Sequence, residues 1–177
     1  MPVSPSNSPP AAKAPTGSSL RLRLWTGHRN PHLEEVTEKM TIVRESKSVH
    51  LDASADTVWQ FVSDFGGYAS WQPHIASVEM QPNGDRKVNF TRGDSVVDRV
   101  TSRDDAAKTL SYGLVPGQPV PMKSLNATFS VSGAGDSADV EYAIEVDVPD
   151  EMASMASVGI GADIDGALEG LKTSFHG

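Results

Sequence analysis

Four side chains near the middle of the chain are of types that could act chemically on a bound molecule. Tyr68 and His74 lie in an aromatic stretch, and Arg92 and Asp98 flank a predicted turn. Catalysis requires an acid or a base beside the substrate, and these side chains can supply one. All four are therefore candidate catalytic residues, although no motif assigns their roles. For His74, a partly exposed residue of a turn is the simpler interpretation.

The turn after Arg92 decides whether Asp98 points into the protein. A three-residue loop ending at Ser95 places two valines and Asp98 on the inward side, whereas a two-residue loop places one valine there. The larger number of valines favours the first register. We therefore expect Asp98 to face the interior, opposite Phe90 and near Arg92. A structural ion pair near the rim is the simplest interpretation, and orienting the polar end of a ligand is the functional one.

Alternating apolar and polar residues predict an antiparallel sheet with one buried face. The alternation is most regular in residues 124–131 and 140–148, where every second residue is apolar. Residues 40–51, 75–80 and 109–114 also have the composition of strands. With the strands on both sides of the turn after Arg92, the expected sheet has about six or seven strands.

Two stretches have the periodicity of helices. Apolar residues recur every three to four positions from Ser54, a plausible N-cap, to Phe65, and Gly66 and Gly67 are expected to end this helix. Residues 152–175 predict a long C-terminal helix that contains Gly159, Gly161, Gly166 and Gly170. Each such glycine costs up to ~1 kcal/mol relative to alanine. These glycines indicate either a close approach to the sheet or room for a ligand beneath the helix.

The aromatic stretch resembles a known family. Its pattern is Val-Trp-x-x-Val-x-Asp-Phe-x-x-Tyr-x-x-Trp-x-Pro-x-Ile, from Val58 to Ile75. It is similar to the polyketide cyclase/dehydrase and lipid transport family of the START-like (SRPBCC) superfamily, and the proline-rich loop around Pro121 keeps the resemblance. The resemblance covers about Met40 to Phe175. It implies an α+β helix-grip fold, in which a curved antiparallel sheet wraps around a long C-terminal helix and a short helix follows the first strand.

A sheet that curls around one helix leaves a concave apolar space, which is the usual form of a small-molecule site. The strand parities and the helix stripe indicate which side chains face this space. The expected ligand-binding residues are Phe65, Tyr68, Trp71, Val78, Phe90, Arg92, Asp98, Tyr112, Leu125, Phe129, Tyr142, Ile160, Ile164 and Leu168.

The resemblance leaves three functions open, because one fold hosts carriers, receptors and enzymes. The first is binding or transport of a small hydrophobic ligand, lipid or polyketide-like, in the internal cavity. The alternative is an enzyme similar to polyketide cyclases and aromatases that uses pocket Arg, Tyr, His and Asp side chains. The third is a protein-interaction module whose cavity is filled by its own side chains.

Composition excludes several other functions. The net charge of −8 argues against nucleic-acid binding, which needs clustered basic residues. The chain has no cysteine, its histidines do not have metal-ligand spacing, and phosphate-loop and dinucleotide motifs are missing, so we expect neither a metal nor a cofactor. No apolar run approaches the ~20 residues of a membrane span, so we expect a soluble, cytoplasmic protein.

The N-terminal residues 1–39 differ in character from the predicted domain at residues 40–177. They are rich in proline and serine, with basic residues but no acidic residue before Glu34, so we expect them to be disordered. They are either an inert leader, including translation from a start upstream of the functional Met40, or an organelle-targeting segment, or a partner-binding tail. The first of these is favoured, because Met40 stands directly before the first strand.

Overall fold

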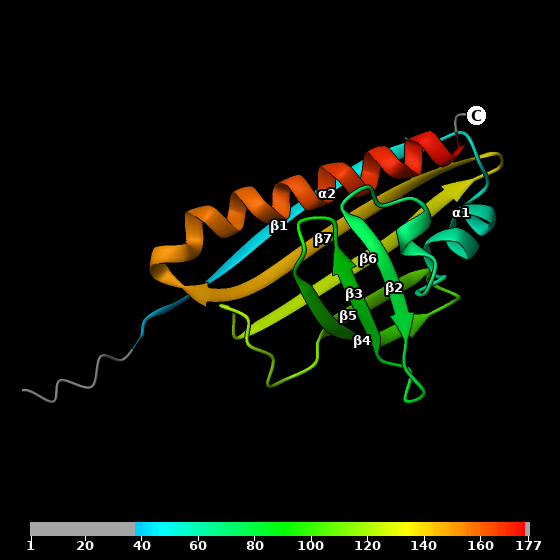
Figure 1. Cartoon of the computed structure of the whole chain (residues 1–177). Helices are drawn as coiled ribbons and strands as arrows, with labels where there is room; N and C mark the ends of the chain where they lie inside the picture. Colours follow the sequence, from blue (N-terminus) through cyan, green and yellow to red (C-terminus); the bar gives the residue numbers. More distant parts are fainter. Residues whose placement is uncertain (1–37, 176–177) are drawn as a thin grey trace, which may run out of the picture. The chain divides into compact units, whose positions relative to one another are not determined.

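The computed structural model describes residues 38–175, which form a single sheet with one long helix packed against it (Figure 1). Most of the N-terminal extension predicted at residues 1–39 lies outside the described residues. In chain order the elements are β1 (Met40–Leu51), α1 (Ala55–Val62), the 3-10 helix η1 (Tyr68–Ser70), β2 (Ile75–Met80), β3 (Arg86–Phe90), β4 (Ser95–Asp104), β5 (Thr109–Leu114), β6 (Ser124–Ala134), β7 (Ser137–Pro149), the 3-10 helix η2 (Asp150–Met152) and α2 (Ala153–Phe175).

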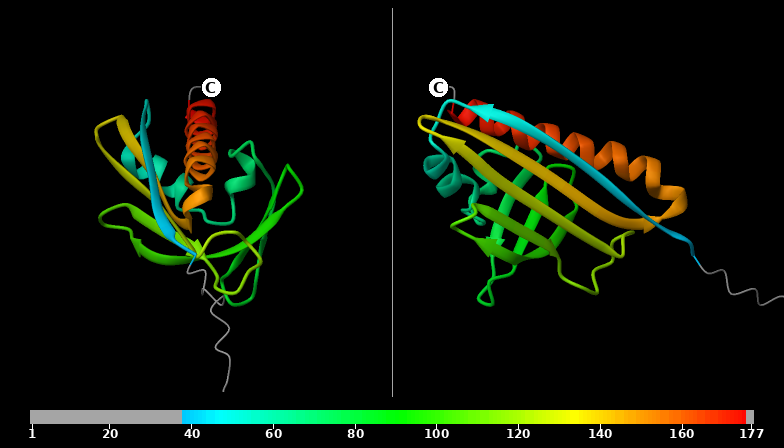
Figure 2. Two further views of the ribbon diagram at one scale, coloured as in Figure 1. Left: turned by 90° about the vertical axis from the view of Figure 1, so that its left-hand side faces the viewer. Right: turned by 180° about the vertical axis from the view of Figure 1, so that it is seen from behind.

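The sheet has seven strands in the order β1-β7-β6-β5-β4-β3-β2, and all neighbours are antiparallel. It curves into an open trough, and α2 runs along the concave side (Figure 2). This arrangement confirms the predicted architecture of a curved sheet around a C-terminal helix. Among residues 38–175, no helix combines the length and the apolar character needed to cross a membrane.

Helix α1 begins as predicted and ends earlier than predicted. Its N-cap is Ser54, whose side chain accepts a hydrogen bond from the backbone N–H of Thr57. The helix ends at Val62 rather than at Phe65, because a turn begins at Asp64, whose carbonyl accepts a hydrogen bond from the N–H of Gly67. Phe65 therefore lies beyond the helix, and its carbonyl accepts a hydrogen bond from the buried side chain of Arg86.

The β3–β4 turn differs from the prediction, because four residues, 91–94, separate the strands and Ser95 already belongs to β4, so the cross-strand partners differ as well. Asp98 is buried, as expected, and its partner on β3 is Arg86 rather than Phe90. Arg92 lies in the turn and pairs there with Asp94. The prediction that Asp98 lies near Arg92 was wrong, because the turn keeps Arg92 out of β3 and beyond the last residue pair of the two strands, Asn89 with Ser95.

The glycines of α2 divide into two groups. A Cβ at Gly170 would overlap the backbone carbonyl of Trp71, and one at Gly166 would lie 3.3 Å from Nδ1 of His74. At Gly159 and Gly161 a Cβ would meet nothing within 4 Å. The C-terminal half of α2 therefore needs glycine to approach the segment before β2, whereas the N-terminal half has open space beside it.

Candidate ligand-binding cavity

A cavity of about 300 Å³ lies between the sheet and the N-terminal half of α2. This volume is at the lower end of the range for small-molecule sites. Its wall is mostly apolar, with polar groups at a few positions. The lining residues are Tyr68, Gln72, His74, Ile75, Arg86, Val88, Phe90, Arg92, Val96, Asp98, Tyr112, Leu114, Pro121, Met122, Leu125, Ala127, Tyr142, Ile144, Val146, Val148, Met152, Met155, Ala156, Gly159, Ile160 and Asp163.

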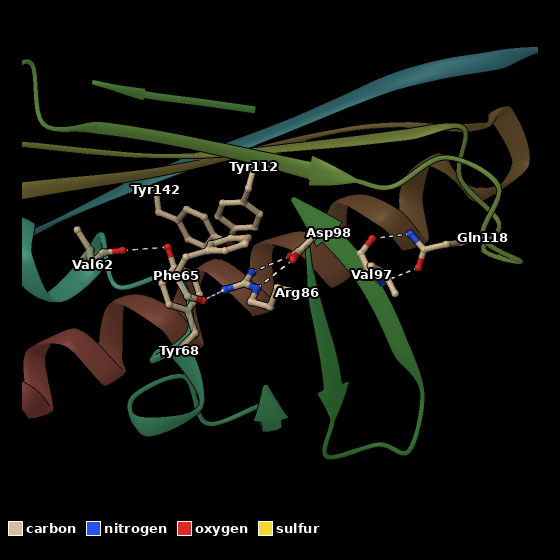
Figure 3. A network of polar contacts seen from close by, with 9 residues as sticks. All are labelled: Val62, Phe65, Tyr68, Arg86, Val97, Asp98, Tyr112, Gln118 and Tyr142. Carbon is tan, nitrogen blue, oxygen red and sulfur yellow. Dashed lines mark hydrogen bonds and ion pairs between the residues drawn. The ribbon is translucent and has the colours of Figure 1, made fainter. Parts of the chain in front are cut away.

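The largest polar feature of the wall is an ion pair between neighbouring strands (Figure 3). Nε of Arg86 donates to Oδ1 of Asp98 at 2.9 Å, and Nη2 donates to Oδ2 at 2.7 Å. Arg86 is 1 % exposed and Asp98 is 4 % exposed. Both charges are buried and bound to each other through two parallel hydrogen bonds, which is the strongest geometry for such a pair.

Aromatic rings enclose the guanidinium group of Arg86. Its Cζ lies 3.7 Å from the ring centre of Phe65, 4.4 Å from that of Tyr68 and 5.0 Å from that of Tyr112. Its Nη1 donates to the carbonyl of Phe65 at 2.7 Å, so the early end of α1 supplies this acceptor. These ring faces stabilise a desolvated cation.

The electrostatics of the pair result from two opposing effects. Burial lowers the pKa of Arg86, but the hydrogen bonds and charge of Asp98 more than offset this, so its pKa is raised. Burial also raises the pKa of Asp98, and Arg86 offsets this only in part. Because each partner is engaged by the other, the pair offers the cavity no free cation and no free carboxylate.

Three buried tyrosines stand close to this pair. The hydroxyl groups of Tyr112 and Tyr142 are 2.7 Å apart, and the hydroxyl of Tyr68 donates to the carbonyl of Val62 at 3.0 Å. Burial raises the pKa of Tyr112 to about 12 and raises the pKa values of Tyr68 and Tyr142 well above their ordinary value. Near neutral pH these phenols are protonated, so they can donate hydrogen bonds and cannot act as bases.

A second group of polar side chains lies at another part of the wall, where the segment before β2 meets α2. Nε2 of His74 is 4.0 Å from Oδ1 of Asp163, and Nε of Arg92 is 2.6 Å from Oδ1 of Asp94. Burial lowers the pKa of His74, with a partial offset from Asp163, and burial raises the pKa of Asp163. The imidazole is therefore mostly neutral at neutral pH and is able to accept a proton.

Gln72 differs from the other polar lining residues because its side-chain amide nitrogen is buried without a hydrogen-bond partner among the described residues. The residue is 3 % exposed, and its Nε2 has no hydrogen-bond partner among residues 38–175. A buried unsatisfied amide is uncommon in folded proteins and costs free energy. The wall thus contains an amide nitrogen whose hydrogen-bonding capacity no other described residue uses.

The structure divides the expected ligand-binding residues into two sets. Those that line the cavity are Tyr68, Phe90, Arg92, Asp98, Tyr112, Leu125, Tyr142 and Ile160, and the candidate catalytic residue His74 lines it as well. Those that pack in the core without lining it are Phe65, Trp71, Val78, Phe129, Ile164 and Leu168. Two of the four candidate catalytic residues, Tyr68 and Asp98, belong to the polar group around the Arg86–Asp98 pair. The other two, His74 and Arg92, belong to the group where the segment before β2 meets α2.

Three polar lining residues were missed from the sequence. Arg86 shares the alternation of Val88 and could have been found by extending that strand toward its N-terminal end. Asp163 lies three residues after Ile160, on the same side of α2. Gln72 had no signal in the sequence, because its burial depends on how the segment before β2 packs under α2.

The chain belongs to the polyketide cyclase / dehydrase and lipid transport family, whose model matches residues 40–176. No curated protein sequence matches the chain. Membership supports ligand binding or cyclase activity in general, without identifying a substrate.

Solved structures with the same fold include proteins of several kinds. The Zhui aromatase/cyclase of a Streptomyces species has a TM-score of 0.67 at 15 % identity, over 77 % of this chain and 94 % of that one. A START superfamily protein from Mycobacterium smegmatis has a TM-score of 0.64 at 19 % identity, over 75 % of this chain and 97 % of that one. A point mutant of norcoclaurine synthase from Thalictrum flavum has a TM-score of 0.61 at 17 % identity, over 78 % of this chain and 99 % of that one. At these identities the similarity establishes the fold alone.

Proposed function

We propose that this protein binds a small hydrophobic molecule in the cavity between the sheet and α2, as a carrier or sensor. The observation that carries the proposal is the cavity itself, whose wall is mostly apolar and whose volume is about 300 Å³. A cavity of this kind favours an apolar ligand, because binding removes apolar surface from water.

The state of the polar side chains favours a carrier over an enzyme. Arg86 and Asp98 bind each other, and the phenols of Tyr112 and Tyr142 are held protonated by burial. The hydroxyl of Tyr68 is committed to a backbone carbonyl. The part of the wall around the Arg86–Asp98 pair therefore contains no group that is ready to take a proton at neutral pH.

A second candidate function, a cyclase or aromatase-like enzyme, rests on the pair of His74 and Asp163. A neutral imidazole that lines a cavity can act as a general base, and the carboxylate 4.0 Å from its Nε2 would orient it once the two approach to hydrogen-bond distance on substrate binding. In this case His74 would take a proton from the substrate and Asp163 would stabilise the imidazolium that forms.

Native mass spectrometry of the protein purified from cells, followed by solvent extraction, tests the first function. The expected result is a stoichiometric hydrophobic adduct. Ala156 lines the cavity, whereas Ala162 is an exposed residue of the same helix that does not line it. Ala156→Phe should therefore abolish the adduct and Ala162→Phe should retain it. An adduct that survives in Ala156→Phe, or failure of apolar probes to bind the purified protein, would contradict cavity binding.

The two functions are separated by a His74→Gln variant. A carrier retains its adduct and has no activity to lose, whereas an enzyme loses turnover and retains substrate binding. Incubation of the extracted molecule with wild-type protein, followed by mass analysis for loss of water or ring closure, provides the second readout.

A further inference from the structure

Both arginines of the cavity wall are already bound to carboxylates, and this limits the kind of ligand that the cavity can hold. Among the described residues, the lining cation Arg86 is paired with Asp98 and the lining cation Arg92 is paired with Asp94. A carboxylate brought into this space would find no free cation to compensate for its lost hydration. Burial of an uncompensated charge is strongly unfavourable.

The local charge balance also disfavours an anion. With His74 mostly neutral, Asp163, Arg92 and Asp94 together carry one more negative than positive charge, because Arg92 attracts both carboxylates and cannot balance both. An anionic head group near α2 would therefore be repelled. An amine could approach Asp163, but it would compete there with His74.

The wall does contain unused hydrogen-bond donors. Tyr112 and Tyr142 have two hydroxyl hydrogens and share one hydrogen bond, so whichever tyrosine accepts that bond keeps a free hydrogen. Gln72 has an amide nitrogen with no partner among residues 38–175. The terminal torsion of glutamine is soft, so a small rotation can turn this nitrogen toward a bound molecule.

We infer that the ligand is an uncharged, mainly apolar molecule with a carbonyl-type oxygen, which accepts a hydrogen bond from Gln72 or from the Tyr112–Tyr142 pair. Ketones, esters and quinones belong to this class, and free fatty acids in their ionised form do not. The inference rests on the proposed function, because it specifies the ligand of the same cavity.

Four naphthalene probes with one varied substituent test the inference. They are 2-acetylnaphthalene, 2-ethylnaphthalene, 2-naphthoate and 2-(aminomethyl)naphthalene, and their dissociation constants are measured by calorimetry at neutral pH. We expect both neutral probes to bind and naphthoate to bind at least about tenfold more weakly than the ketone. Tightest binding by naphthoate or by the amine would overturn the assignment of an uncharged ligand.

Variants identify the hydrogen bond independently of probe hydrophobicity. Gln72→Met and Tyr142→Phe each remove a donor and approximately keep the shape of the side chain. In at least one of them the ketone should lose about fivefold in affinity, while 2-ethylnaphthalene changes less than about twofold. The control Leu125→Met changes an apolar lining residue and should affect both neutral probes equally.

The outcomes distinguish this inference from the proposed function. If both neutral probes bind and neither variant affects the ketone selectively, cavity binding stands and the carbonyl-type ligand is wrong. If none of the four probes binds, the proposed cavity binding and the inferred carbonyl-type ligand are both wrong.

Discussion

Arg86 and Asp98 face each other across adjacent strands and form a bidentate ion pair that is almost completely buried in the wall of the cavity (Figure 3). The pair joins β3 to β4, and through the carbonyl of Phe65 it also ties both strands to the segment after α1. It therefore fixes the part of the trough against which a ligand would lie.

Removal of one partner should be far more harmful than removal of both. Arg86→Met leaves the carboxylate of Asp98 buried without compensation, which should lower the free energy of unfolding by about 3–5 kcal/mol. The double variant Arg86→Met with Asp98→Leu should recover most of this loss. Urea unfolding monitored by circular dichroism measures both effects.

An exposed ion pair on the same sheet provides the control. Arg44 and Glu145 join β1 to β7 with their side chains 66 % and 42 % exposed. Arg44→Met should cost less than about 1 kcal/mol, because water screens the pair. Equal costs for Arg44→Met and Arg86→Met would contradict a special role for the buried pair.

The sequence predicts the fold well because its information is local and repeated. Alternation in β6 and β7 and the apolar stripe of α2 each extend over many residues, so single exceptions do not alter the assignment. The end of α1 was misplaced because the turn that follows the helix begins at Asp64 and already includes Phe65, with Gly67 closing it. The spacing of apolar residues continues to Phe65, so periodicity alone does not show where the helix ends.

The site is less predictable because it depends on contacts between distant segments. The inward orientation of Asp98 was predicted correctly, but its partner was not, because the turn occupies residues 91–94 instead of ending at Ser95 and so shifts the register of the two strands. The burial of Gln72 and the proximity of His74 to Asp163 depend on how α2 crosses the segment before β2. The sequence of neither segment alone predicts how the two pack against each other.

Two glycines of α2 should respond oppositely to alanine. At Gly170 the added methyl group would overlap the carbonyl of Trp71, so Gly170→Ala should cost about 1–3 kcal/mol as the helix is pushed away. At Gly161 nothing lies within 4 Å, and alanine is the better helix former, so Gly161→Ala should stabilise by up to ~1 kcal/mol. Thermal unfolding of both variants tests this, and destabilisation by Gly161→Ala would show that α2 needs flexibility there.

His74 should make the protein less stable as the pH falls below neutrality. Burial lowers its pKa below the ordinary 6.5, so the unfolded chain binds this proton more readily than the folded chain. Stability therefore falls as the pH drops through about 6.5, and the loss stops once the lowered pKa is passed. The raised pKa of Asp163 acts in the opposite direction at lower pH, so measurements should stay above about pH 5.5.

The variant His74→Gln isolates this effect. Its free energy of unfolding between about pH 7 and 5.5 should decrease less steeply than that of the wild type, whatever its absolute stability. Parallel curves for the two proteins would mean that the pKa of His74 is the same in the folded and unfolded states.

The tyrosines should not ionise while the protein remains folded. The chain has three, Tyr68, Tyr112 and Tyr142, and burial raises the pKa of each. Because the folded state keeps these protons longer than the unfolded state, stability should fall as the pH rises above about 10. Tyrosinate absorbance and circular dichroism should then change together in one transition. Tyrosinate formation near pH 10 with native circular dichroism would contradict their burial, and protein in urea serves as the control.

Two glutamines allow the cost of an unused amide to be measured. The amide of Gln118 accepts a hydrogen bond from the N–H of Val97 and donates to the carbonyl of Val97 (Figure 3). It also donates to the carbonyl of Val115, whereas Nε2 of Gln72 has no partner among the described residues. Gln118→Met should therefore destabilise by at least about 1 kcal/mol, because it leaves backbone groups unsatisfied.

Gln72→Met should instead leave the ligand-free protein as stable as the wild type or more stable, by up to about 1 kcal/mol, because it removes a buried donor that has no partner. Urea unfolding of ligand-free protein, prepared by solvent extraction and refolding, gives both values. A gain in stability together with weaker ketone binding is the pattern of a residue that is kept for its ligand. A loss in stability as large as that of Gln118→Met would show that the amide of Gln72 has a structural partner in the folded protein.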